Sequence, residues 1–183
     1  MISPTQFLVR PNNLVDSQRL FHGRGHAYPE LEHVNIDWIA PALIITLYAE
    51  VERDWLETLC QELAALFPEC ESLQVQYRCR PKAPFEVMQG SELTQLTAVE
   101  NELKYHISLG RAQNTGLFLD IANGRTWVKE NSQDKNVLNL FSYTCAFSVA
   151  AIAGGAKRVV NIDMAKGALS TGRDNHRLND HDI

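Results

Sequence analysis

Two stretches of the sequence decide the fold, Val137-Leu138-Asn139-Leu140-Phe141 and Val159-Val160-Asn161-Ile162-Asp163. Each contains a nearly continuous apolar run, which is typical of a strand buried on both faces of a parallel sheet. The segments that follow them, Thr144–Ala153 and Lys166–Leu178, are predicted to be helices, and the first is ended by Gly154-Gly155. Strand, helix, strand and helix at this spacing indicate a parallel β-α-β unit with a right-handed crossover.

The residues ahead of this unit predict a separate α+β domain. Its expected elements are strands over Val34–Trp38 and Ala42–Tyr48 with a turn at Pro41, a helix over Arg53–Phe67 and a strand over 73–77, and 85–88 and 103–109 are further strand candidates. Within the first of these last three strands, apolar residues at 73, 75 and 77 alternate with polar ones, so one face is expected to be buried and the other wet.

The fold class is therefore predicted as α/β, in two domains. Residues 1–112 are expected to form the α+β domain, in the order strand-strand-helix-strand-strand. Residues 113–183 are expected to form the first β-α-β-α portion of a Rossmann-like domain, entered through a strand or turn at Thr115–Asp120 and a helix at Asn123–Asn131. A complete sheet of this class has further strands, so the chain is expected to be incomplete at its end.

The composition is that of an ordinary globular protein. The 183 residues are 45% hydrophobic and 21% charged, and the net charge of −5 gives no global electrostatic case for nucleic-acid binding. The most apolar stretch, Ile39–Tyr48, is far too short to span a bilayer, and no secretory signal precedes it. No membrane partner is therefore expected. The four cysteines show neither C-x-x-C spacing nor a tight cluster, which predicts free thiols in a cytoplasmic protein without a bound metal.

Two features at the carboxyl ends of the predicted parallel strands are suited to bind a ligand, because open parallel sheets collect ligands there. One is the turn Phe141–Cys145, which leads into a helix. The other is Asp163, which follows Phe141 at about the 20-residue spacing that dinucleotide enzymes use for the acid that binds a ribose. The spacing predicts a ligand that contains a nucleoside. Asp163 has a second interpretation as the N-cap of the helix that follows.

The turn helps to choose the ligand. A dinucleotide brings its pyrophosphate onto the helix N-terminus, which requires the glycines of G-x-G-x-x-G. The turn here has no glycine and contains bulky Phe141 and Tyr143. S-adenosylmethionine has no phosphate, so the turn favours this methyl donor over NAD.

The stretch Val137–Phe147 resembles the first motif of class I S-adenosylmethionine-dependent methyltransferases. It is most similar to the branch that modifies large-subunit ribosomal RNA at cytosine C5 or guanine N2, which reads F-x-Y-T-G where this chain has Phe141-Ser142-Tyr143-Thr144-Cys145. In the wider class the turn reads D-x-G-x-G-x-G, so Asn139 stands in place of the acid, and residues 141, 143 and 145 stand in place of the glycines. Val159–Met164 resembles the second motif, whose acid holds the ribose.

The resemblance implies S-adenosylmethionine as cofactor and a set of residues that bind it: Asn139, Phe141, Ser142, Tyr143, Thr144, Cys145, Asp163 and Met164. Thr115–Asp120 with Arg125 resembles the T-G-x-F-L-D-x-R-x-x-R segment of the same branch, with Ala122 replacing the first arginine. The first hundred residues do not resemble the RNA-binding domain that often opens these enzymes. The Asp-Pro-Pro-type motif that orients the target base has no match, so the resemblance assigns no catalytic residue, and the chain alone is expected to be inactive.

Three further groups each have two interpretations. Cys145 lies at a predicted helix N-terminus, which would lower its thiol pKa and suit a nucleophile, but the attacking cysteine of the resembling enzymes comes later, so packing against the cofactor is favoured. His22-Gly23-Arg24-Gly25-His26 is read as a loop with exposed histidines rather than a metal or phosphate site. Arg78, Arg80 and Lys82 form either a solvated strand face or a contact for the RNA backbone.

The sequence as a whole predicts a methyltransferase that acts on a base of RNA, with ribosomal RNA as the partner. The alternatives are a non-catalytic nucleotide-binding or assembly module and an NAD-dependent oxidoreductase. The sequence does not identify the RNA or the atom that is methylated. A short parallel sheet also leaves an exposed edge, which predicts self-association.

Overall fold

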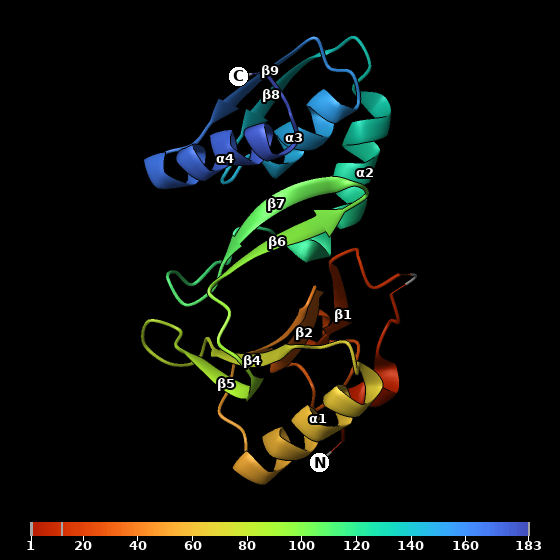
Figure 1. The fold of residues 1–183 in the computed structure, drawn as a ribbon, viewed down its shortest axis with the longest axis vertical. Helices are drawn as coiled ribbons and strands as arrows, with labels where there is room; N and C mark the ends of the chain where they lie inside the picture. The colour runs from red at the N-terminus through yellow and green to blue at the C-terminus, as the bar shows by residue number, and fades with distance from the viewer. Residues whose placement is uncertain (1, 12, 183) are drawn as a thin grey trace. The chain divides into compact units, whose positions relative to one another are not determined.

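The computed structural model describes residues 2–11 and 13–182. They form two compact units, which are described separately here (Figure 1). The first contains the residues up to Leu96 together with Ser108–Thr115, and the second contains Thr97–Ile107 and the residues from Gly116 onward. The two units therefore differ from the predicted boundary between residues 112 and 113 in two segments, since residues 97–107 belong to the second unit and residues 113–115 to the first.

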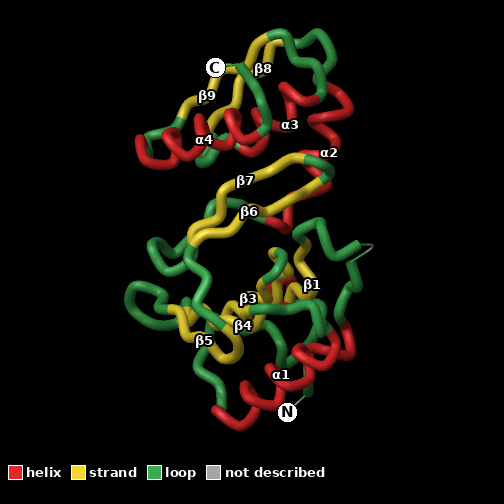
Figure 2. Tube along the Cα trace, in the orientation of Figure 1, coloured by secondary structure: helices red, strands yellow, loops and turns green. Residues whose placement is uncertain are grey.

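The first unit is built on a five-stranded mixed sheet. Its strands are β1 (Gln18–His22), β2 (Val34–Ile39), β3 (Ala42–Leu47), β4 (Ser72–Tyr77) and β5 (Phe85–Gly90), in the order β1-β2-β3-β4-β5. The helix α1 (Arg53–Leu66) connects β3 to β4, which are parallel, and the other pairs are antiparallel. Short 3-10 helices cover Pro4–Phe7 and Gly23–Gly25. In Figure 2 the strands of this unit are yellow and its helix α1 is red, and this mixture makes the unit α+β.

Helix α1 closes the core of the first unit. Leu56, Leu59 and Leu63 recur at helical spacing and are buried in one cluster with the apolar side chains of β2, β3 and β4. This confirms the predicted helix and the strands on both sides of it. Strand β1 was not predicted, because its five residues show no alternation and its pairing with β2 contains a register shift.

The expectation of a wet face on β4 is wrong. All six residues of the strand are buried, including Gln74 and Gln76. Their amides are satisfied by backbone carbonyls of later segments, since Gln74 Nε2 donates to Leu93 O at 3.0 Å and Gln76 Nε2 donates to Gln113 O at 3.0 Å. A glutamine can be buried at small cost when its amide is paired in this way, and a polar-apolar alternation does not reveal it.

The second unit contains the expected β-α-β-α arrangement. Its elements are the 3-10 helix Leu119–Ile121, α2 (Ala122–Asn131), β8 (Asn136–Leu140), α3 (Ala146–Ala153), β9 (Arg158–Ile162) and α4 (Lys166–Leu178). Strands β8 and β9 are parallel and in register from Asn136–Arg158 to Leu140–Ile162. The strands β6 (Gln95–Glu100) and β7 (Leu103–Ser108), of which β6 was not predicted, pair with each other and place residues 97–107 in this unit.

Burial of β8 and β9 differs from the expectation of two covered faces. Helix α3 contacts both strands, and Val137, Asn139, Val159 and Asn161 are half-buried. The alternate positions, Leu138, Leu140, Val160 and Ile162, are exposed although all four are apolar. The crossover helix covers only one face of a parallel pair, and no other described residue covers the second.

A buried ion pair joins the segment 97–107 to α2. Arg125 Nε and Nη2 donate to the two carboxylate oxygens of Glu100 at 2.7 and 2.6 Å, and Nη2 also donates to Phe118 O at 2.9 Å. The side chains of Arg125 and Glu100 are 2% and 7% exposed. Arg125, which the resemblance picked out, therefore has a structural partner on β6.

Replacing Arg125 by methionine is expected to destabilise the second unit strongly. The change leaves the Glu100 carboxylate buried without its partner, which typically costs about 3–5 kcal/mol of unfolding free energy. Urea denaturation of the variant measures this loss. The matched control is Arg177→Met, which removes the exposed Arg177–Asp174 pair on α4 and should cost at most about 1 kcal/mol. Equal losses in the two variants would contradict the assignment.

Candidate functional site

The carboxyl ends of β8 and β9 lie side by side because the strands are parallel and in register. The turn Phe141–Cys145 leaves β8, and Asp163 follows β9. The carboxylate of Asp163 connects the two turns, since Oδ2 accepts from the Tyr143 N–H at 2.8 Å and Oδ1 accepts from the Ala165 N–H at 2.8 Å. The structure thus brings the two halves of the predicted site together.

Asp163 is ionised and is not the N-cap of α4. The N–H of Ala165 first, and that of Tyr143 second, lower the pKa of the Asp163 carboxyl. The N-cap position of α4 is Ala165, two residues later, so the bond to Ala165 N–H closes a local turn of the Asx type. A carboxylate accepts about four hydrogen bonds, and the two backbone bonds therefore leave room for ribose hydroxyls.

The turn after β8 has an unusual backbone. Phe141, Tyr143 and Cys145 have φ of 53°, 47° and 60° and lie in the left-handed region. These are the three positions that correspond to glycines in the wider class, where a left-handed residue carries no steric penalty. Each bulky residue costs about 1–2 kcal/mol in this conformation, so the surrounding bonds must hold the turn in place.

Backbone and side-chain hydrogen bonds supply that restraint. Ser142 N–H donates to Ile162 O at 3.1 Å, and Cys145 N–H donates to Ser142 O at 2.7 Å. The buried hydroxyl of Thr144 donates to Gly116 O at 2.5 Å, which ties the turn to the segment that leads into α2. The turn is therefore fixed before any ligand arrives.

Cys145 is a packing residue in this structure. Its side chain is buried against Gly172 of α4, where an added Cβ would lie 2.4 Å from the Cys145 sulfur. Burial raises the pKa of the Cys145 thiol. The expectation of a lowered pKa is wrong, because desolvation of the thiolate outweighs the effect of the helix N-terminus.

The remaining predicted residues lie in different surroundings. Phe141, which directly follows β8, is 91% exposed, and Met164, which directly follows Asp163, is 98% exposed. Asn139 points to the helix-covered face of the sheet, and its Nδ2 donates to Asn161 Oδ1 at 2.9 Å. A role for Asn139 in holding the cofactor stays a prediction, as does every other cofactor contact.

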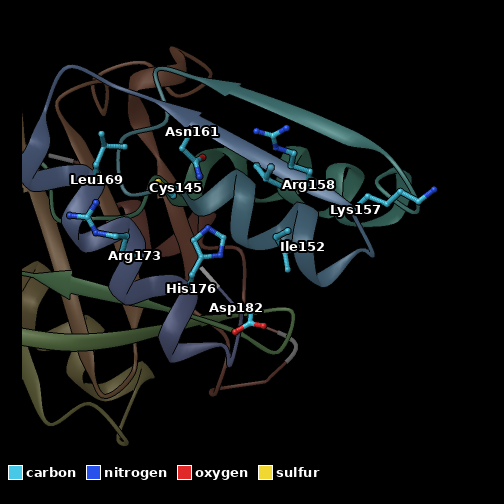
Figure 3. A pocket seen from close by; sticks show the side chains of 10 residues that line it. Cys145, Ile152, Lys157, Arg158, Asn161, Leu169, Arg173, His176 and Asp182 are labelled. Carbon is cyan, nitrogen blue, oxygen red and sulfur yellow. The ribbon is translucent and has the colours of Figure 1, made fainter.

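A cavity of ≈ 440 Å³ lies on the helix-covered side of β9 (Figure 3). Asn161, Leu169, Arg173 and His176 line it, and Cys145 is the one predicted site residue among its lining. Asp163 and residues 141–144 do not line it. The cavity is thus distinct from the strand ends where the two turns meet.

Sequence reasoning missed the buried polar residues of α4 that support the turn. Asn175 Nδ2 donates to Thr144 O at 2.9 Å, and His176 Nε2 lies 2.8 Å from Ser148 Oγ, which donates to Cys145 O. Burial, and then the neighbouring His181, lowers the pKa of His176 to about 4, so this imidazole is neutral at pH 7. The sequence carried no signal for them, because their partners in the turn and in α3 are distant along the chain.

The structure also allows a check of the predictions on metal binding, the segment 22–26 and membrane-spanning helices. They contain no set of three His, Cys, Asp or Glu side chains placed to hold a metal. In the histidine-containing segment, His22 ends β1 and its Nδ1 lies 2.7 Å from Arg19 Nη1. No helix in the described part of the chain has the length and apolar character needed to cross a membrane.

Comparison with known proteins identifies the family. The family model described as S-adenosylmethionine-dependent methyltransferase matches residues 18–183. The chain belongs to this family. This membership agrees with the predicted family of S-adenosylmethionine-dependent methyltransferases and not with the alternative of an NAD-dependent oxidoreductase.

Curated methyltransferases of the family are similar over most of this chain. Ribosomal RNA large subunit methyltransferase I of Enterobacter sp. (strain 638) is 31% identical over 175 residues, which cover 92% of this chain and 43% of that protein. The protein of the same name from Aeromonas salmonicida is 36% identical over 146 residues, which cover 76% and 36%. The chain therefore spans less than half the length of these relatives.

The solved structure of the protein SMU.776 shows the same fold. SMU.776, which was crystallised with S-adenosylhomocysteine, superposes with a TM-score of 0.81 at 27% identity, covering 93% of this chain and 44% of that one. The likeness confirms the predicted Rossmann-like class.

Proposed function

We propose that this chain supplies the cofactor-binding part of a methyltransferase that acts on a base of ribosomal RNA. The observation that carries the proposal is the pair of turns held by Asp163, in a chain of the methyltransferase family. The relatives from Enterobacter and Aeromonas are named for ribosomal RNA of the large subunit, which supports that substrate. The same substrate implies a cytoplasmic protein.

The residues at the strand ends fit S-adenosylmethionine. The ionised Asp163 keeps acceptor positions for two ribose hydroxyls, and the exposed Phe141 and Met164 offer apolar surface to the adenine ring. Nothing in the turn provides the glycine-rich cradle that a pyrophosphate needs. The bound cofactor supplies an electrophilic methyl group on its sulfonium, and the residues here contribute by positioning it.

A cluster in the first unit supports contact with RNA. The guanidinium groups of Arg24 and Arg78 lie 4.3 and 5.6 Å from the centre of the Tyr48 ring. Neither arginine forms an ion pair with a described residue, and Arg78 Nε is buried without a hydrogen-bond partner in that part of the chain. Unneutralised arginines beside an aromatic ring are suited to phosphates and stacked bases.

The predicted basic strip is divided by the structure. Arg80 lies over the Tyr77 ring at 3.8 Å and forms two hydrogen bonds with Glu50 at 2.7 and 2.6 Å, so its charge is offset. We therefore assign the RNA contact to the Arg24–Tyr48–Arg78 cluster and not to Arg80. Arg78 lies in the turn after β4 and not on a strand face.

The exposed face of β8 and β9 also has a proposed partner, which is a second copy of this chain. Leu138, Leu140, Val160 and Ile162 form contiguous apolar surface on a two-stranded sheet whose strands are both edges. Edges with apolar faces pair readily with an identical edge.

Asp163→Asn is expected to weaken binding of S-adenosylhomocysteine by at least about a hundredfold, because charge-assisted bonds to both ribose hydroxyls are lost. Calorimetric titration measures the affinity, and the thermal midpoint is recorded alongside it. The matched control is Asp174→Asn, an exposed acid on α4 whose partner is Arg177. It should leave the affinity unchanged. An unaltered affinity in Asp163→Asn would remove its role as ribose ligand.

The double change Arg24→Gln and Arg78→Gln should weaken binding to a large-subunit ribosomal RNA fragment. The dependence of log affinity on log salt should also become less steep, by about 1 for each phosphate contact removed. Filter binding at several salt concentrations gives both values. Arg53→Gln is the control, because Arg53 in the same unit is already paired with Glu57 and Glu86. Equal effects of the two changes would contradict the cluster as an RNA site.

Sedimentation velocity should show concentration-dependent association of this chain. Leu138→Gln should shift the equilibrium towards monomer, because a polar group then interrupts the apolar face. Leu66→Gln, at an exposed leucine of α1, serves as the control and should not change it. A wild-type chain that stays monomeric at all concentrations would exclude this partner.

A further inference from the structure

Helix α4 and its C-cap residue present two asparagines, about one turn apart, to the edge of β7. Asn179 Oδ1 accepts from Lys104 N–H at 2.8 Å, and its Nδ2 donates to Lys104 O at 2.7 Å. Asn175 Oδ1 accepts from His106 N–H at 2.8 Å. Residues 104 and 106 have their N–H groups on the same edge of the strand, because alternate residues repeat along it. The two amides therefore satisfy an edge of β7 as a neighbouring strand would.

Asn175 differs from Asn179 in what its amide nitrogen does. Asn175 Nδ2 reaches the turn after β8 and donates to Thr144 O at 2.9 Å, whereas Asn179 Nδ2 donates to backbone carbonyls of β7 and of its own helix. Asn175 is 0% exposed and Thr144 is also buried. A buried carbonyl without a partner is costly, so this bond restricts the turn strongly.

The hydrogen bond from Asn175 Nδ2 restrains the oxygen of one peptide group of the turn. Thr144 O and Cys145 N–H belong to the same peptide group, and the N–H is held by Ser142 O at 2.7 Å. With Asn175 on the oxygen, both polar ends of this plane are bonded. The plane joins Thr144 to Cys145, and its orientation sets the φ of Cys145, one of the left-handed residues whose conformation needs external support.

We propose that Asn175 is a positioning residue for the cofactor-binding turn, which it locks to β7 by using both ends of one buried amide. The inference rests on the proposed cofactor site, because the turn matters for methyl transfer only if S-adenosylmethionine binds there. Asn175 does not touch the cofactor. It sets the backbone on which Tyr143 N–H meets Asp163, the residue assigned to the ribose.

Asn175→Asp separates the two ends of the amide. The aspartate keeps an oxygen to accept from His106 N–H, but it places a second oxygen against Thr144 O in place of the donor. Asn175→Ala removes both bonds without burying a charge, and it replaces the aspartate if that variant does not fold. The matched control is Asn179→Asp, which keeps the bond from Lys104 N–H and loses the donations to Lys104 O and Asn175 O. Asn179 forms no hydrogen bond with the described residues of the turn, so the control leaves both Asn175 side-chain bonds in place.

Two measurements are made on each variant of the chain. The first is amide hydrogen exchange of residues 141–145 and of His106 without ligand, and the second is the affinity for S-adenosylhomocysteine. Exchange in the turn should accelerate, and affinity fall, by at least about tenfold in Asn175→Asp and Asn175→Ala, the equivalent of one buried hydrogen bond. Exchange at His106 should stay slow in Asn175→Asp. Asn179→Asp should change neither the turn nor the affinity.

The outcomes distinguish this inference from the proposed function. Turn exchange in the Asn175 variants that equals that of Asn179→Asp would overturn the positioning role. A wild-type chain that does not bind S-adenosylhomocysteine would contradict the cofactor proposal, while exchange without ligand would still decide whether Asn175 orders the turn.

Discussion

The carboxylate of Asp163 holds together the two turns on which the site depends. Its two oxygens accept from backbone N–H groups of different turns, Tyr143 after β8 and Ala165 after β9. These bonds favour the ionised form, as the lowered pKa of Asp163 indicates. The acid that we assign to the ribose is thereby placed and charged before the ligand binds, which reduces the free energy spent on ordering the site.

The rest of the second unit supports this arrangement. The turn after β8 has three residues other than glycine in the left-handed conformation. Hydrogen bonds to Ile162 O and Gly116 O and from Asn175 Nδ2 hold it in place. Further from the turn, the Arg125–Glu100 ion pair joins α2 to β6, and Asn175 of α4 and the C-cap residue Asn179 form hydrogen bonds with the backbone of β7. A turn with unfavourable intrinsic geometry is thus stabilised by polar groups that are themselves buried and paired.

The sequence predicted what periodicity and motif spacing control. The helices α1 and α4 and the strands β8 and β9 follow from apolar patterns, and the alignment of residues 141, 143 and 145 with glycine positions agrees with their positive φ. It did not predict features that depend on contacts between distant segments. Gln74 and Gln76 are buried because later loops cover them, Cys145 has a raised pKa because Gly172 admits it to the interior, and Asn175 is recognisable only once β7 is placed beside α4. The same holds for residues 97–107, which are bonded in the second unit to Arg125, Asn175 and Asn179.

The most direct test of this account is calorimetric titration of the chain with S-adenosylhomocysteine and, separately, with NAD. The turn lacks the glycines that a pyrophosphate requires, and Asp163 retains acceptor positions for a ribose. We predict saturable binding of S-adenosylhomocysteine and no measurable binding of NAD. Binding of NAD more tightly than S-adenosylhomocysteine would contradict the assignment of the two turns as a methyl-donor site.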